Sequence, residues 1–143
     1  MTVSQPNSEV LGISLGANAT LDITNSAIFR AQEGTATGTN LGFIDVEAGS
    51  TFTYGGVLNN QNTIQLIGTG AATAGAFLLG DTTLKGGGNF FLSDTVHNSV
   101  RGFDTLTNVD NLIEGAGTIQ TDIINKALGT IEASSGGNKL LIL

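Results

Sequence analysis

The stretch TNVDNLIE, residues 107–114, joins an asparagine-rich turn to a short run in which apolar and polar residues alternate. A close copy, LNNQNTIQ, occupies residues 58–65, and a looser one, NKALGTIE, occupies residues 125–132. Ile113 and Ile131 are 18 residues apart, whereas Ile64 and Ile113 are 49 apart. The first spacing is about one turn of a wide β-solenoid, and two turns with loops would fill the second.

The rest of the chain also consists of short β-type runs separated by glycine or asparagine. Residues 21–23 and 52–54 alternate strictly, which places one face inward and one face in water. No stretch keeps a helical spacing of apolar residues without an interrupting glycine. Residues 17–21 and 48–52 share a small-turn-small-Thr-apolar pattern at an offset of 31. Runs of three to five residues suit the sides of a coil, so the sequence predicts an all-β, right-handed parallel β-helix of about five to six coils.

The turn chemistry predicts specific corner and core residues. Asparagine and glycine accept the left-handed backbone of a sharp corner, and stacked asparagines can hydrogen-bond as an amide ladder. The predicted corner and ladder residues are Asn59, Asn62, Asn108, Asn111, Asn125 and Gly129. The apolar residue after each corner should point inward, which gives a predicted core of Leu21, Phe52, Ile64, Phe91, Ile113, Ile119, Ile131 and Leu141.

Composition sets further bounds. The 143 residues suit one domain over 1–143, with residues 1–10 as an N-terminal arm or cap. The absence of cysteine excludes disulfides, thiolate metal sites and a cysteine nucleophile. Five basic and 12 acidic residues, a net charge of −7, argue against nucleic-acid partners. No apolar window is long enough for membrane insertion, and the first twenty residues lack the pattern of a secretory signal peptide.

A family resemblance adds to this interpretation. The segments 83–94 (TLKGGGNFFLSD), 98–102 (NSVRG) and 106–119 (LTNVDNLIEGAGTI) resemble the repeats of bacterial β-helical surface and secreted proteins. Autotransporter passengers and filamentous-haemagglutinin-like adhesins are the families concerned, and related β-helices occur in phage spikes and capsid-attached proteins. The resemblance is good over 83–143. It implies a right-handed parallel β-helix and specifies no particular activity.

The side chains that could act in catalysis or metal binding do not form a known catalytic pattern. His97, the single histidine, has no triad or zinc-binding spacing around it. Carboxylates on adjacent rungs can serve acid-base or calcium chemistry, but solvated faces or corners explain Asp94, Asp104, Asp110, Glu114 and Asp122 better. The Gly86–Gly88 run lacks the aspartates of calcium β-rolls. Flat rows of threonine bind ice in some β-solenoids, but here residues 35–39 are the single Thr-x-Thr row, so a polar loop explains them better. We therefore expect no catalytic residue, no cofactor and no metal.

The ends of the coil stack suggest partners. The terminal apolar strand has no polar cap after it, so we expect an interface at Leu140, Leu141, Ile142 and Leu143. The continuation of a longer chain would cover this strand, and so would a homo-oligomer, for which the analogy with phage proteins suggests a trimer. Surface carbohydrate is a further expected partner. The expected function is a non-enzymatic, adhesin-like structural module, extracellular or at the cell surface. The alternatives are a virion decoration or spike protein of a phage and a polysaccharide-active β-helix.

Overall fold

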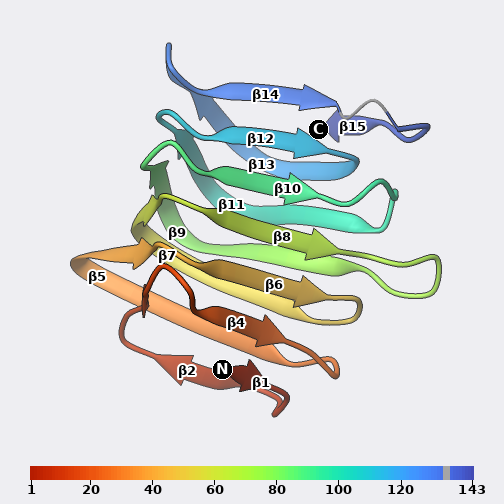
Figure 1. Cartoon of the computed structure of the whole chain (residues 1–143). Helices are drawn as coiled ribbons and strands as arrows, with labels where there is room; N and C mark the ends of the chain where they lie inside the picture. Colours follow the sequence, from red (N-terminus) through yellow and green to blue (C-terminus); the bar gives the residue numbers. More distant parts are fainter. Residues whose placement is uncertain (134–135) are drawn as a thin grey trace.

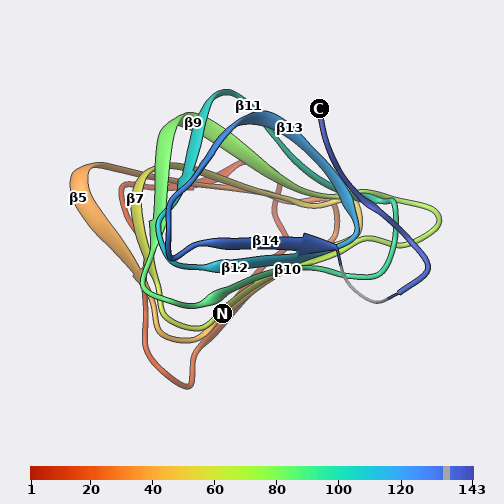
Figure 2. The ribbon, with the colours of Figure 1, turned by 90° about the horizontal axis from the view of Figure 1, so that it is seen from above.

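The fold is a coil of short parallel strands, as Figure 1 shows. The structure is a computed structural model that describes residues 1–133 and 136–143, including all of their side chains except those of residues 33–35. No helix long and apolar enough to cross a membrane occurs in these residues. The chain runs counterclockwise as it rises toward the viewer in Figure 2, so the solenoid is right-handed, with about six turns. The predicted fold class is thereby confirmed.

Two parallel sheets form the walls of the coil. The first sheet contains one short strand per turn, in the order β1 (Thr2–Val3), β4 (Thr20–Ile23), β6 (Phe43–Glu47), β8 (Thr63–Ile67), β10 (Asn89–Leu92), β12 (Leu112–Gly115) and β14 (Thr130–Ala133). The second contains the longer strands β2 (Ser8–Val10), β5 (Ile28–Asn40), β7 (Thr51–Asn60), β9 (Ala74–Lys85), β11 (Asn98–Asn108), β13 (Gly117–Asn125) and β15 (Leu140–Ile142), and β3 (Ser14–Leu15) also pairs with β5.

The long strands bend within their length, and the bend gives the coil its third corner. Register shifts occur between Gln32 and Thr37 in β5, between Tyr54 and Gly56 in β7 and between Arg101 and Thr105 in β11. At each of these points one strand has two or three more residues than its neighbour, which interrupts the regular pairing. Gly56 adopts a φ of 104° at this point, which a residue with a side chain rarely adopts. The cross-section in Figure 2 is accordingly three-sided.

Stacked apolar columns form the core. On the first sheet Ile44, Ile64, Phe90 and Ile113 follow one another in register, and Ile131 continues the column. The two isoleucines 49 residues apart are therefore two turns apart, and Ile113 and Ile131 are one turn apart, as predicted. Predicted core residues that are buried are Leu21, Phe52, Ile64, Ile113 and Ile119.

Three predicted core positions differ in the structure. Phe90, not Phe91, faces inward, because alternation along β10 buries Phe90 and Leu92 and leaves Phe91 half-buried on the outer face. Ile131 is only partly buried against the core. Leu141 is 50% exposed, since it pairs with Thr118 of β13 and has no strand on its other side. Two adjacent phenylalanines give no period of their own, so the register of the neighbouring strands decides which one is inside.

The N-terminal segment forms a turn of its own. Thr2 and Val3 pair with Asp22 and Ile23, and residues 8–10 pair with residues 29–31 of β5. The first ten residues therefore lie in register beneath the second turn and extend both sheets, in place of an arm that folds across the end.

The repeat at residues 17–21 and 48–52 does not mark equivalent positions in the coil. Thr20 begins β4 in the first sheet, whereas Thr51 begins β7 in the second sheet. The two segments thus turn different corners and share only the need for small residues before a strand.

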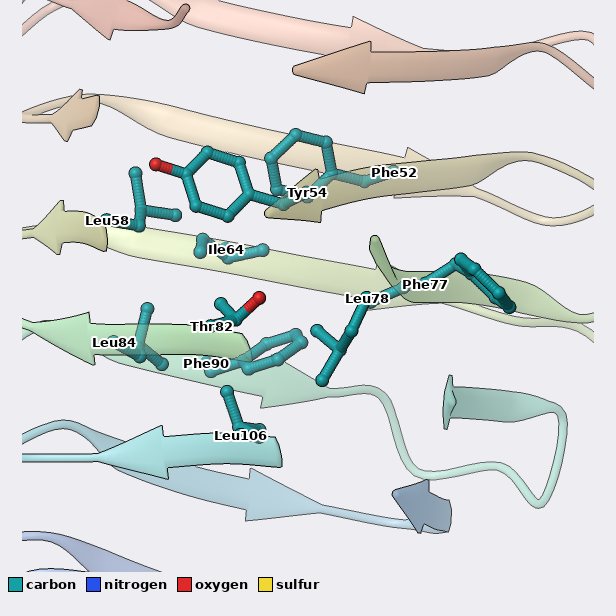
Figure 3. Close-up of a pocket in the computed structure, with 11 residues that line it drawn as sticks. Phe52, Tyr54, Leu58, Ile64, Phe77, Leu78, Thr82, Leu84, Phe90 and Leu106 are labelled. Atoms are coloured by element: carbon teal, nitrogen blue, oxygen red, sulfur yellow. The ribbon is translucent and has the colours of Figure 1, made fainter. Parts of the chain in front are cut away.

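A small void lies among the core side chains, as shown in Figure 3. Its volume is about 30 Å³, and apolar side chains such as Leu58, Ile64 and Phe90 line it. The Tyr54 hydroxyl near it already donates to the Val57 carbonyl oxygen at 2.7 Å. A space of this size holds at most one or two water molecules. It is small and lined almost entirely by the apolar core.

Candidate functional site

Asparagine amides link the turns at one corner of the solenoid. The Asn40 amide donates to Asn60 Oδ1 at 2.7 Å, and the Asn60 amide donates to Asn111 Oδ1 at 2.9 Å. The Asn108 amide donates to Asn125 Oδ1 at 2.8 Å. Asn40, Asn60 and Asn108 are fully buried. The amide ladder that the sequence predicted therefore exists, with Asn40 and Asn60 as additional members.

The ladder bypasses one turn. Between Asn60 and Asn111 the intervening turn contributes Gly86, Gly87 and Gly88, which carry no side chain, so the two amides meet directly across it. A Cβ atom on Gly88 would lie 2.4 Å from the Asn62 carbonyl oxygen and 2.7 Å from Asn60 Nδ2. The glycine run is thus the space through which the ladder continues.

The predicted corner asparagines do not adopt the left-handed backbone that was expected of them. None of the five predicted corner asparagines has a positive φ, so their role lies in their amides and not in a left-handed backbone. Among the residues that the structure describes, Asn59 has no amide partner in the ladder, whereas its neighbour Asn60 does. Asn62 donates to the Leu41 carbonyl oxygen at 3.1 Å. Gly129 is needed for space, since its Cβ would lie 2.5 Å from Asn125 Oδ1.

Three of the acidic residues singled out in the sequence, Asp110, Glu114 and Asp94, bond to different turns. Asp110 Oδ1 accepts bonds from the backbone N–H groups of Gly86 at 2.7 Å and Gly87 at 3.1 Å. Glu114 Oε1 accepts from the Asn89 amide at 2.7 Å. Asp94 accepts from the Asn138 backbone N–H at 3.3 Å. These carboxylates hold turns together. Asp104 and Asp122 lie on neighbouring strands at the bend, where Thr105 pairs with Asp122.

Other candidate groups have structural surroundings. The backbone of His97 donates to Thr95 Oγ1 at 3.2 Å, and its carbonyl oxygen accepts from the Ala74 N–H at 3.0 Å. Within residues 1–133 and 136–143, no three His, Asp or Glu side chains gather as a metal site. Part of the threonine row, residues 35–39, lies among the side chains that are not described.

A different set of residues forms a groove on the outer face of the long strands. Arg30 of β5, Thr53 of β7, Phe77 of β9 and Arg101 of β11 are aligned by the strand register. They point outward, because the residues beside them face the core: Phe29, Ala31, Phe52, Tyr54, Ala76, Leu78 and Val100 are all buried. Together with Ile28 and Thr51 they line a hollow of about 200 Å³, the lateral groove.

Residue size gives the lateral groove its shape. Thr53 is only 2% exposed and Ser99 7%, although both belong to the outer face, so larger neighbours cover them. Gly75 pairs with Thr51, and a Cβ on Gly75 would already lie 3.3 Å from Thr51 Oγ1. Of the residues that line the groove, Thr51 and Thr53 are the small ones and form its floor. Arg30, Phe77 and Arg101 stand beside it, and in Figure 3 Phe77 lies apart from the core residues.

The charge of the lateral groove is opposite to that of the chain. Arg30 and Arg101 are the only arginines in a sequence with five basic and 12 acidic residues. Glu9 is aligned with Arg30 on β2, and Gln120 with Arg101 on β13. The sequence gives no sign that Arg30 and Arg101, which are 71 positions apart, lie in one row. Their alignment depends on the lengths of the three turns between them. A second hollow of about 310 Å³ follows at the bend of β5, β7 and β9, three of the four strands of the lateral groove, and is lined by Gln32, Gly55, Gly56, Leu79, Gly80 and Asp81.

An acidic row on the opposite sheet shows the electrostatic cost of stacking. Asp22 of β4 and Asp45 of β6 are aligned in register on the outer face. Burial raises the pKa of Asp45 above its ordinary value of 3.8, and the nearby charges of Asp22 and Glu47 raise it further. Asp45 Oδ1 is buried without a hydrogen-bond partner. The ionised Asp45 therefore opposes folding.

We expect Asp45→Asn to raise the melting temperature at pH 7. The folded protein holds the Asp45 proton more tightly than the unfolded chain, so stability falls as pH rises from 3.8 through the raised pKa. The gain should disappear below pH 3.8, where both states are protonated. Thermal unfolding of both proteins at pH 7 and at a pH below 3.8 measures this difference in melting temperature. Asp122→Asn, at an exposed position, removes the same charge as a control, and an equal gain in both variants would contradict the local explanation.

Comparison with protein-family models, with curated proteins and with solved structures gives no match to the chain.

Proposed function

We propose that this β-solenoid is a non-catalytic structural and interaction module, an adhesin-like part of a surface or secreted protein. The observation that supports this is the use of its carboxylates. Asp110 binds two backbone N–H groups of the glycine turn, and Glu114 binds the Asn89 amide. Acid-base chemistry needs carboxyl groups that face a substrate. Here these groups join one turn to the next, which makes a stiff stack whose sides are available to partners.

The test of this proposal compares binding with turnover. The protein is incubated with acidic and neutral polysaccharides, and viscosity and newly formed reducing or unsaturated ends are followed over time. We expect both to remain at the level of a buffer control while the protein refolds and unfolds normally. A protein-dependent fall in viscosity with new chain ends would overturn the proposal and favour the polysaccharide-active alternative.

The last turn favours a second candidate, an oligomeric virion component. In the described structure β14 pairs only with β12 and β15 only with β13, so both present an unpaired edge. Leu141, Ile142 and Leu143 are 50%, 48% and 67% exposed. Exposed edges with apolar side chains are templates for association. Either the continuation of a longer chain or further copies of this chain would cover this end, and for copies the analogy with phage β-helices suggests a trimer.

Size-exclusion chromatography with light scattering tests this second candidate. We expect an oligomer for the wild-type chain and a shift toward monomer for Leu141→Lys, whose side chain lies on the exposed end. Val96→Lys, at an exposed corner position away from that end, adds the same charge as a control. A wild-type chain that stays monomeric at high concentration would contradict association through this end.

A further inference from the structure

We infer that the lateral groove binds a carboxylate-bearing sugar unit of an acidic glycan. The inference rests on the proposed interaction function and names the site and the ligand chemistry. Arg30 and Arg101 stand on strands three steps apart, about 14 Å along the solenoid axis at about 4.8 Å per strand. Phe77 lies between them in the same row.

Charge selects the class of ligand. A chain with a net charge of −7 repels polyanions in general, yet both of its arginines are on one face and in one row. The guanidinium group is a planar fork that matches a carboxylate with two parallel hydrogen bonds. Attraction restricted to one spot on an acidic surface gives specificity, because carboxylates elsewhere on the ligand are repelled.

The floor and the aromatic wall select a sugar. Phe77 is half-buried and offers an apolar ring, while Thr51 is a half-buried hydroxyl-bearing residue on the floor. A pyranose ring has apolar C–H faces and a polar edge, so it fits a site with one aromatic wall and hydroxyl donors. The volume of about 200 Å³ is smaller than a typical drug-sized pocket and suits one or two rings of a chain.

The strand pairing argues against an extended peptide in the same place. Peptides that bind sheets usually add a strand to an open edge. β7 and β9 are hydrogen-bonded on both sides, so the groove floor has no free backbone edge. Side chains alone must therefore recognise the ligand, which again favours a rigid ring with a carboxylate.

The experiment measures binding of purified oligogalacturonate to the intact chain by calorimetry, with uncharged dextran oligomers and dextran sulfate as comparison probes. We expect oligogalacturonate to bind and dextran not to bind. Arg30→Gln combined with Arg101→Gln should weaken binding at least about tenfold, the equivalent of one lost charged hydrogen bond. Phe77→Ala should weaken it as well, with the melting temperature of each variant recorded to verify folding.

The matched control is Lys85→Gln combined with Lys126→Gln. It changes net charge by the same amount but removes cations at or near the asparagine corner, outside the lateral groove. We expect this control to bind like the wild type. Equal losses in both double variants, or tight binding of dextran sulfate with none of oligogalacturonate, would overturn the inference as non-specific charge attraction. So would a wild-type chain that binds no oligogalacturonate. The absence of turnover is measured separately, so the proposed function can survive any of these outcomes.

Discussion

Asn60→Ala is expected to lower the free energy of unfolding by about 3–5 kcal/mol. The Asn60 side chain accepts from Asn40 and donates to the Asn89 carbonyl oxygen at 3.1 Å and to Asn111 Oδ1 at 2.9 Å. Asn60 is fully buried, so water cannot replace the lost bonds in the native state. Each buried polar group left without a partner costs about 1–3 kcal/mol. Urea unfolding followed by circular dichroism measures the change.

The neighbouring asparagine provides the control for this effect. Asn59 is half-buried and outside the amide ladder, so Asn59→Ala should change the free energy of unfolding by only about 0.5 kcal/mol. Asn60→Asp keeps the shape but removes the amide donor, and it should be at least as destabilising as Asn60→Ala because it buries a charge. Equal effects of Asn59→Ala and Asn60→Ala would show that the ladder does not hold the turns together.

Gly115→Ala is expected to cost about 4 kcal/mol or more, or to prevent folding. Gly115 has a φ of 122°, and a Cβ there would lie 1.7 Å from the Leu92 carbonyl oxygen of the turn below. That oxygen accepts a hydrogen bond from the Ala116 N–H at 3.2 Å. The added methyl group would have to separate β10 from β12. Soluble yield and the midpoint of thermal unfolding report the loss.

Gly70→Ala is the matched control, since Gly70 is exposed and an added Cβ would meet no atom within 4 Å. It should leave the melting temperature unchanged or slightly raised, because alanine restricts the unfolded chain more than glycine does. A stable, normally folded Gly115→Ala protein would mean that the backbone at this rung relaxes without cost, against the packing described above.

The fold class was predictable from the sequence because turn chemistry and alternation are local properties. The copies at residues 58–65 and 107–114 place Ile64 and Ile113 in the same column, as their spacing indicated. The same local logic could not choose between Phe90 and Phe91, nor between Asn59 and Asn60. In each pair both residues suit the pattern, and the register with the adjacent strand selects one.

The lateral groove could not be predicted from the sequence, because its residues have no fixed spacing along the chain. Successive turns of this solenoid differ in length, so residues of one row do not recur at a fixed period. Arg30 and Arg101 looked scattered along the chain, and only the pairing of β5, β7, β9 and β11 brings them together. A repeat of constant length would have shown the row directly.

The sequence by itself determined that this chain coils: frequent glycine and asparagine turns, short alternating runs and a single proline suit strands that are hydrogen-bonded on both sides. The tertiary structure alone decided which side chains meet between turns. Contacts between turns join residues 17 or more positions apart. Their pairing depends on irregularities in the strands and on the length of each corner, which no local preference specifies. The amide ladder, the glycine gap it crosses and the two-arginine groove all arise at that level.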